Sequence, residues 1–278
     1  MPRLKRTLRF LVAVSILAAA TAGARVTAET EPLAIPDAPP STPDLDAARG
    51  LISTAVERYR ALHGYQARYE KDELGDDGRL KEEKSFFKFE KPFILYMLWD
   101  KGERKDTHLL YAQDHYDDKM IMQMPGLLFS FVGPVTIATD DPRVAKDQKH
   151  SIKKAGIGFF IEDLWSDFQR LELVGGIEAR GIEKGVDVEG ERGTLVDLEL
   201  RDPQENYPRK AVVISEKTGL PIEIRLYKPD TKLVETFRYL DLVPNPPADD
   251  PAFRKIANPA LFKKYVEAAS PGTSSQHS

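Results

Sequence analysis

The sequence contains no cysteine. This absence excludes a disulfide framework, a thiol nucleophile and a cysteine that could carry a lipid behind a signal sequence. Histidine is scarce, with five among 278 residues, and no two have the helical spacing and following acid of a zinc site. The chain also lacks a phosphate loop, a dinucleotide fingerprint and a Gly-x-Ser-x-Gly elbow. We therefore expect a protein that is not an enzyme and that holds no metal and no cofactor.

Two groups of charged residues could still carry chemistry. His115 lies among the acids of a predicted turn at Asp117-Asp118, where solvated, turn-forming acids are a better explanation than metal binding. Glu162, Asp163 and Asp167 could line a cleft beside a predicted helix. As a catalytic carboxylate pair they would need a defined separation, which residue spacing cannot supply.

Long apolar runs are also missing after the N-terminus. The run Phe10–Ala20 follows four basic residues and no acid, the pattern of a secretory signal peptide over residues 1–24. Cleavage could follow Ala24 or Ala28, each preceded by a small-x-small pattern. The run is shorter than the roughly 18 residues of a spanning helix, which favours a cleaved signal over an uncleaved anchor. We expect an exported, periplasmic protein that is not lipidated.

Net charge limits the possible partners. Cleavage after Ala24 would remove four bases and no acid, so the formal charge of −4 would become −8. An acidic mature chain argues against nucleic acid as a partner and against simple electrostatic binding to anionic membranes. Its partners are expected among apolar molecules or other proteins.

The remaining sequence divides into a linker, one domain and a tail. Residues 25–42 form a proline-rich linker, residues 43–268 a single domain, and residues 269–278 a tail that we expect to be disordered. The domain begins with a helix, because Thr42 suits the N-cap, Pro43 the first turn, and apolar residues recur at helical spacing as far as Leu62. Gly64 fits the C-terminal cap of that helix.

From Tyr65 the apolar period changes from about 3.6 to 2, which indicates strands. A hairpin is expected about Asp76-Asp77-Gly78, then a strand Phe93–Trp99 that is apolar on both faces and therefore lies beneath something on each side. Apolar spacing predicts a second helix over residues 158–173, and alternating strands follow it. The result is a mainly β protein with helices (α+β): a curved antiparallel sheet, or incomplete barrel, covered on its concave side by helices.

Several motifs of the chain resemble those of a known family. The stretch Leu62–Lys71, then Phe87–Phe93 with its Lys91-Pro92, and Lys149–Gly158 resemble a secreted bacterial family known as domain of unknown function 1571. More remotely the pattern is similar to the periplasmic lipoprotein carriers of the LolA and LolB type and to sigma-factor regulators of the RseB type. The similarity spans about residues 47–258, and its motifs specify a fold better than a function.

The resemblance implies an apolar cavity that receives a lipid or the acyl chains of a lipoprotein. Burying each methylene contributes about 0.8 kcal/mol, so an acyl anchor cannot cross water exposed. Arg68 matches, by spacing alone, the arginine that closes the cavity of the carriers. The candidate lining is aromatic, aliphatic and methionine-rich, with the last four residues as a possible lid: Phe87, Phe89, Phe93, Leu95, Met97, Trp99, Leu110, Met120, Met122, Leu127, Leu128, Phe129 and Phe131.

Two alternatives remain open from the sequence. The same apolar residues could fill a solid core and hold nothing. The concavity could also bind a segment of an envelope protein, as expected for a stress sensor or adaptor of the regulator type.

Overall fold

The computed structural model describes residues 43–75, 77–126, 133–141 and 150–270. These residues belong to one compact unit, residues 38–278. The predicted signal peptide, its cleavage sites and most of the tail lie outside the described residues.

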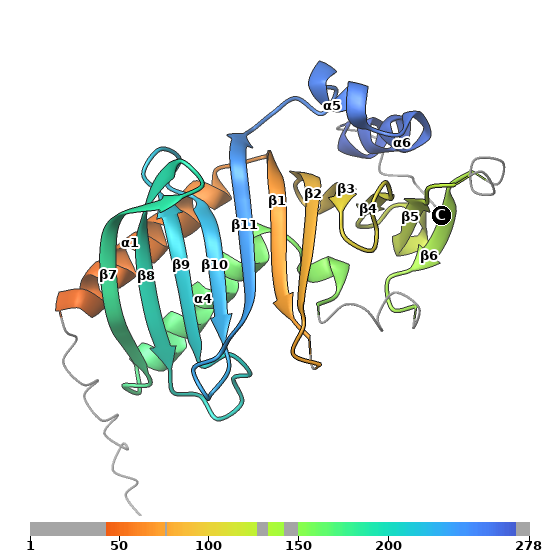
Figure 1. Cartoon of the computed structure of the whole chain (residues 1–278). Helices are drawn as coiled ribbons and strands as arrows, with labels where there is room; N and C mark the ends of the chain where they lie inside the picture. The colour runs from red at the N-terminus through yellow and green to blue at the C-terminus, as the bar shows by residue number, and fades with distance from the viewer. Residues whose placement is uncertain (1–42, 76, 127–132, 142–149, 271–278) are drawn as a thin grey trace, which may run out of the picture. The chain divides into compact units, whose positions relative to one another are not determined.

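Helices flank and interrupt a long series of strands (Figure 1). In chain order the elements are α1 (Pro43–Arg60), β1 (Gly64–Leu74), β2 (Leu80–Glu90), β3 (Ile94–Lys101), β4 (His108–Ala112), η1 (Tyr116–Asp118), β5 (Lys119–Gln123), β6 (Val135–Ala138), η2 (Ile152–Lys154), α4 (Ile157–Glu172), β7 (Ile177–Val188), β8 (Glu191–Leu200), β9 (Arg209–Ser215), β10 (Pro221–Tyr227), β11 (Leu233–Pro244), α5 (Pro251–Ile256) and α6 (Pro259–Ala269).

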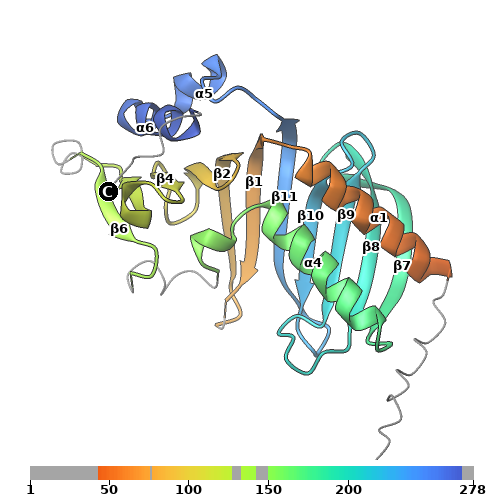
Figure 2. The ribbon, with the colours of Figure 1, turned by 180° about the vertical axis from the view of Figure 1, so that it is seen from behind.

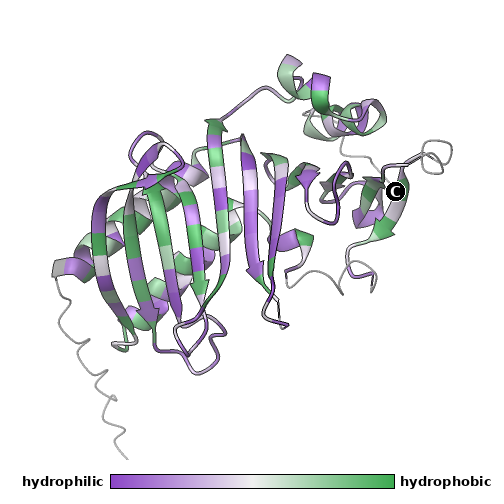
Figure 3. Ribbon diagram, in the orientation of Figure 1, coloured by the Kyte–Doolittle hydropathy of each residue, from purple (hydrophilic) through white to green (hydrophobic). Residues whose placement is uncertain are grey.

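The described strands form one open antiparallel sheet of 11 strands, in the order β6-β5-β4-β3-β2-β1-β11-β10-β9-β8-β7. Two meanders, β1–β6 and β7–β11, are therefore joined where β1 pairs with β11. Hydrophobic and hydrophilic bands alternate along the strands (Figure 3), as expected when successive side chains point to opposite faces. The mainly β, antiparallel fold predicted from the sequence is confirmed.

Two helices, α1 and α4, lie across the β7–β11 half of one face of this sheet, which we call the helix face (Figure 2). Most of the apolar residues predicted to line the two helices are buried, from Leu45 to Tyr59 in α1 and from Ile161 to Leu171 in α4, but Phe159 is 40% exposed. One boundary was predicted wrongly. α1 ends at Arg60, and Gly64 is the first residue of β1 and not the cap of α1. Its backbone lies so close to β2 that a Cβ would be 2.5 Å from the Phe89 carbonyl oxygen, which explains why this residue is glycine.

The C-terminal helices α5 and α6 cover part of the opposite face, which we call the outer face. Phe253 and Tyr265 from these helices pack on Tyr96 and Leu110 of β3 and β4. Leu95, on the other side of β3, belongs to the large core cluster of the helix face. The strand predicted to be apolar on both faces is therefore buried on both.

A hydrogen-bond chain anchors α6 to the sheet. The Tyr96 hydroxyl accepts a bond from the Asn258 amide at 2.8 Å and lies 2.7 Å from His108 Nδ1. The hydroxyl carries one proton and two lone pairs, so it can donate to an unprotonated Nδ1 while it accepts from Asn258. Burial lowers the pKa of His108 below its ordinary 6.5, against a smaller opposing effect of Asp106. Burial therefore favours the neutral imidazole beside this anchor.

We predict that acid weakens the anchoring of α5 and α6. The pKa of His108 is lower in the folded protein than in the unfolded chain. As the pH falls below 6.5 the unfolded chain therefore binds more protons than the folded protein, and the folded state loses stability until the pH reaches the folded pKa. Hydrogen exchange at about pH 5.5 and about pH 7.5, corrected for intrinsic rates, should show weaker protection of α6 at the lower pH. His108→Gln keeps an acceptor without titrating and should abolish the difference. The same pH dependence in that variant would contradict this account.

Candidate functional site

A half-enclosed cavity of about 1030 Å³ opens on the helix face. It lies between the strands β1, β2, β3, β10 and β11 and a wall made by η2, the start of α4 and residues 205–210. Its volume is at the upper end of the range of about 300–1,000 Å³ typical of small-molecule pockets. The sheet is therefore not packed solidly against its own helices along its whole length.

Aromatic rings from neighbouring strands form the floor of the cavity. Tyr69 of β1 lies 5.5 Å from Phe87 of β2 and 5.3 Å from Tyr239 of β11, between ring centroids. Phe237 and Trp99 extend the floor along β11 and β3. Rings at these separations stabilise one another beyond simple burial. The floor is therefore a fixed apolar surface on which an apolar chain could lie.

Two glycines place the wall against the sheet. The Tyr65 hydroxyl accepts a hydrogen bond of 2.9 Å from the Ile157 amide at the start of α4. A Cβ on Gly156 would lie 2.6 Å from that hydroxyl, and a Cβ on Gly158 would lie 2.0 Å from the ring of Tyr59 in α1. Burial raises the pKa of Tyr65 well above its ordinary value, so the hydroxyl stays neutral. Close approach of tyrosine hydroxyls and rings thus explains the Gly-x-Gly motif that opens α4.

A buried carboxylate lies directly behind the cavity wall. Glu235 on β11 has a side chain that is 0% exposed, and its Oε2 lies 2.9 Å from Nε2 of His150. Its Oε1 lies 3.8 Å from Nζ of Lys71, too far for a hydrogen bond. Lys71 also pairs with Glu73, two residues along β1. His150, Lys71 and Glu73 line the cavity in front of Glu235.

A buried lysine marks the other end of the same wall. Nζ of Lys210 lies 3.0 Å from Asp167, 3.1 Å from Glu205 and 3.7 Å from Asp163. Burial lowers the pKa of Lys210, but Glu205 and Asp167 outweigh it and hold the pKa above its ordinary value. Of the three acids that the sequence suggested could line a cleft, Asp163 lines the cavity. Asp167 lies behind it as a partner of Lys210, and Glu162 pairs with Arg60.

The rim of the cavity combines a stacked ion pair with exposed apolar side chains. Arg104 lies over the Trp99 ring at 5.6 Å, and its Nη1 is 3.7 Å from Oε1 of Glu83. Leu80 and Phe159 are 59% and 40% exposed at this rim. Exposed large apolar residues beside a cavity mark a place where an apolar molecule can enter.

The residues predicted to line the cavity lie in several different parts of the structure. Phe87, Met97 and Trp99 line the cavity. Phe89, Phe93, Leu95, Met120 and Met122 belong to the same helix-face core but pack against other side chains and do not line it. Leu127, Leu128, Phe129 and Phe131 lie outside the described residues.

Leu110 was assigned to the wrong face. It packs on the outer face with Ile94 and Phe253, beneath the C-terminal helices, whereas its neighbours Leu109 and Tyr111 point to the helix face. Since β4 is buried on both faces, its sequence carries no alternation to show which residues point inward. The choice between Leu109 and Leu110 could not be made from apolarity.

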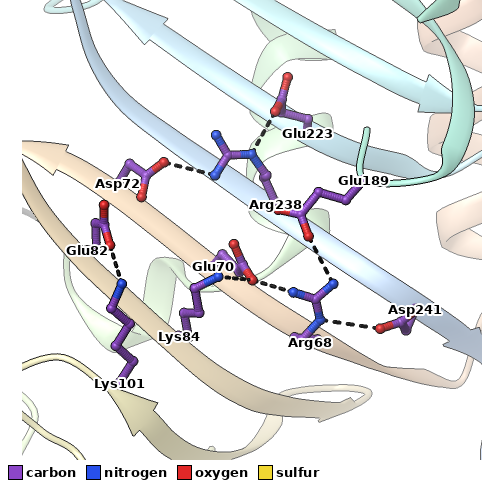
Figure 4. Close-up of polar contacts among 10 residues, drawn as sticks. All are labelled: Arg68, Glu70, Asp72, Glu82, Lys84, Lys101, Glu189, Glu223, Arg238 and Asp241. Atoms are coloured by element: carbon purple, nitrogen blue, oxygen red, sulfur yellow. Dashed lines mark hydrogen bonds and ion pairs between the residues drawn. The ribbon is translucent and has the colours of Figure 1, made fainter. Parts of the chain in front are cut away.

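Arg68 also lies on the outer face, away from the cavity (Figure 4). It pairs with Glu70, with Glu189 at 3.1 Å and with Asp241 at 3.3 Å. Its neighbours Ala67 and Tyr69 point to the helix face, so strand alternation directs Arg68 outward. The match by spacing to a cavity-closing arginine was therefore wrong.

The charges around Arg68 continue across the outer face and satisfy one another (Figure 4). Arg238 bridges Asp72 at 2.8 Å and Glu223 at 2.9 Å, and Lys84 bonds Glu70 at 2.7 Å. The cations are partly exposed, but Glu70 and Glu223 are only 5% and 6% exposed, so the pairs compensate carboxylates that would otherwise be buried without a partner. This network links neighbouring strands on the outer face.

Sequence reasoning missed most of the cavity. Tyr69, Phe237 and Tyr239 were visible as inward residues of alternating strands, but nothing in the sequence paired β11 with β1. Among the residues that the structure describes, no group of three or more potential ligand side chains could hold a metal. Within the same residues, no helix combines the length and apolarity needed to cross a membrane.

The sequence profile of a family described as "Protein of unknown function (DUF1571)" matches residues 62–262. The chain belongs to this family, as its motifs predicted. No curated protein matches the sequence.

Several solved structures are similar to the chain. MucB matches with a TM-score of 0.43 and 15% identity, and the match covers 77% of this chain and 63% of MucB. A structure of the MucA/MucB complex of Pseudomonas aeruginosa is also similar to the chain. The Mycobacterium tuberculosis lipoprotein LppX matches with a TM-score of 0.39 and 11% identity, over 72% of this chain and 94% of LppX. A LolA superfamily protein from Nitrosomonas europaea matches with a TM-score of 0.33 and 10% identity, over 73% of this chain and 95% of that protein. Similarities this remote carry no conclusion about function.

Proposed function

We propose that the protein is a periplasmic, non-enzymatic binding protein that holds a lipid, or the acyl chains of a lipoprotein, in the cavity on its helix face. One observation supports this function above others: a cavity of about 1030 Å³ with an aromatic floor, set beside exposed apolar side chains. The periplasmic location rests on the predicted signal peptide.

The energetics favour an acyl chain as the guest. Each methylene that leaves water contributes about 0.8 kcal/mol, so a chain of a dozen carbons supplies several kcal/mol even after the cost of ordering it. The floor formed by Tyr69, Phe87 and Tyr239 needs no rearrangement to receive such a chain, because its rings already pack on one another. A rigid floor reduces the entropy lost on binding.

The alternative, an adaptor that binds a segment of an envelope protein, uses the same cavity. The charged wall around Lys210 and Glu235 is the observation in its favour, since a polypeptide offers polar groups as well as apolar ones. A pull-down with crosslinking separates the two functions. An adaptor should retain one specific envelope protein, whereas a carrier should yield several lipoproteins or extractable lipid.

Filling the cavity should reduce binding without unfolding the protein. Ala155 lines the cavity, is half-buried and has an extended backbone, which a larger side chain tolerates. We expect Ala155→Phe to weaken binding of a fluorescent acyl probe with an uncharged head group by about tenfold, equivalent to about 1.4 kcal/mol. Fluorescence titration measures this change.

Ala47→Phe is the matched control, because Ala47 is exposed on α1 and far in sequence from the lining. It should bind the probe as the unchanged protein does. A folded Ala155→Phe variant with full affinity would contradict the assignment of the cavity as the binding site.

A further inference from the structure

The floor of the cavity changes from apolar to charged along the strands that form it. On β1, Tyr69 lines the cavity and Lys71 follows it on the same face. On β2, Phe87 lines the cavity, and Glu83 and Lys81 lie nearer to the start of that strand. On both strands the charged residues therefore lie toward the connection between β1 and β2.

The strands β11 and β10 repeat this change. Phe237 of β11 lines the cavity, and Glu235 lies two residues nearer to the start of β11, on the same face. Ile224 and Leu226 of β10 line the cavity, and Lys228 follows just after that strand. Since β1 and β11 are antiparallel, the β1–β2 and β10–β11 connections lie at the same edge of the sheet (Figure 1). We call the part of the cavity at this edge the hairpin end.

The hairpin end is the open end of the cavity. Leu80, Lys81 and Lys228 line it and are exposed, Leu80 to 59%. Phe87 and Met97, which line the other end, are only 1% and 5% exposed. Lys81 and Phe87 are six residues apart on β2, which corresponds to about 20 Å along the strand. The cavity therefore runs from an open, charged end to a buried, apolar end.

Solid packing closes the apolar end, which we call the closed end. Tyr65 stacks on Phe87 and Phe89, with 5.8 and 5.4 Å between ring centroids, and neither Tyr65 nor Phe89 lines the cavity. At Gly156 the wall approaches the sheet so closely that a Cβ would lie 2.6 Å from the Tyr65 hydroxyl. None of the described strand residues that line this end is charged. A head group placed here would lose its hydrogen bonds to water where no charged strand residue could replace them.

Charges of both signs stand at the hairpin end and pair with one another. Lys71 pairs with Glu73, and Nη1 of Arg104 lies 3.7 Å from Oε1 of Glu83. These pairs offer hydrogen-bond donors as well as acceptors, so they suit a polar head group without selecting its charge. Lys154 of η2 also lines the cavity, but it is exposed, so water and salt screen its charge.

We propose that the guest is an amphiphile with one polar end that binds chain-first. The end of its apolar chain lies at the closed end, beside Phe87 and Met97, and its head group lies at the hairpin end, beside Lys71 and Arg104. This inference rests on the proposed binding function and fixes the direction in which that site is occupied. It excludes the opposite direction and chains with a polar group at both ends, because one polar group would then be buried at the closed end.

Two brominated forms of dodecanoate test the direction, one brominated beside the carboxylate and one at the terminal carbon. In the full chain carrying Trp165→Phe, Trp99 reports on the hairpin end, since its Nε1 lies 3.4 Å from Oε2 of Glu83. Met97→Trp, combined with Trp99→Phe and Trp165→Phe, places the reporter at the closed end. We expect bromine beside the carboxylate to quench Trp99 more strongly than terminal bromine does, and the order to reverse in the Met97→Trp protein.

The outcomes separate the direction from the binding function. The opposite order, or equal quenching by the two forms in both proteins, would overturn the direction while leaving acyl binding intact. Absence of quenching by either form, together with absence of binding in calorimetry, would overturn the proposed function itself.

A polar substitution at the closed end tests the same inference without bromine. Met97→Gln changes little volume, and we expect it to weaken binding of the uncharged acyl probe by about tenfold, because the glutamine amide opposes the end of the chain. Leu233→Gln is the matched control, because Leu233 is 42% exposed at the start of β11 and lies outside the lining. Full affinity or tighter binding in a folded Met97→Gln variant, or an equal loss in the control, would overturn the assignment.

Discussion

Replacing Gly158 by alanine is expected to lower the free energy of unfolding by about 3 kcal/mol. An added Cβ would lie 2.0 Å from the ring of Tyr59, so α1 and α4 could not keep their spacing. Because Gly158 has an ordinary helical backbone, the loss comes from crowding alone. Urea denaturation followed by circular dichroism measures it.

Gly50→Ala provides the control for this substitution. Gly50 lies in α1, with nothing within 4 Å of an added Cβ, so alanine there should stabilise the protein by about 0.5–1 kcal/mol through helix propensity. Tyr59→Leu should also reduce the effect of Gly158→Ala, because residues in contact are not additive. A stable Gly158→Ala variant would contradict the packing of the two helices described above.

Replacing Phe253 by alanine is expected to cost about 4 kcal/mol and to release the C-terminal helices. Phe253 is 1% exposed, and its ring lies 4.9 Å from Tyr96, 5.1 Å from Tyr265 and 5.7 Å from Phe86, between centroids. Truncation leaves a cavity that its neighbours cannot fill, since strands hold two of them. Hydrogen exchange should show loss of protection in α6 before the rest of the sheet.

Phe159→Ala is the matched control for this truncation. Phe159 is 40% exposed at the rim of the cavity, so its removal should cost less than about 1 kcal/mol of stability. It should instead weaken binding of the acyl probe. If both phenylalanine variants lost stability equally, the outer-face packing of α5 would be wrong.

The helix-face helices and the strands were predictable because each element carries its own periodic signal. α1 and α4 repeat apolar residues at helical spacing, and β8 alternates the buried residues Val196, Leu198 and Leu200 with Asp197 and Glu199. The turn at Asp77-Gly78 joins β1 and β2 as its residue types indicated. Such signals are local, so one sequence suffices to find them.

The C-terminal helices had a local signal that went unused. Asp250 and Asn258 each precede a proline, and each side chain caps its helix by accepting a bond of 3.0 Å from the amide two residues on. An N-cap residue followed by proline is a recognisable helix start. The helices were missed because α5 has only six residues, too few for an apolar period.

The cavity depended on information that no local pattern contains. Lys71, His150 and Glu235 are far apart in the sequence and meet only because β1 pairs with β11 and because His150, just before η2, lies against Glu235. The register of that pairing decides which charges become neighbours. Composition predicted an apolar interior, but the charged residues along one side of it come together only in the tertiary arrangement.

The central claim is that the cavity shelters an apolar chain, and Trp99 on its lining reports this directly. The chain has two tryptophans, so Trp165→Phe leaves Trp99 alone, and Trp99→Phe leaves only Trp165, which lies outside the lining. Titration with a brominated dodecyl amphiphile should quench the fluorescence of Trp99 in the first variant and spare Trp165 in the second. Equal quenching of both, or none of Trp99 at saturation, would contradict the account.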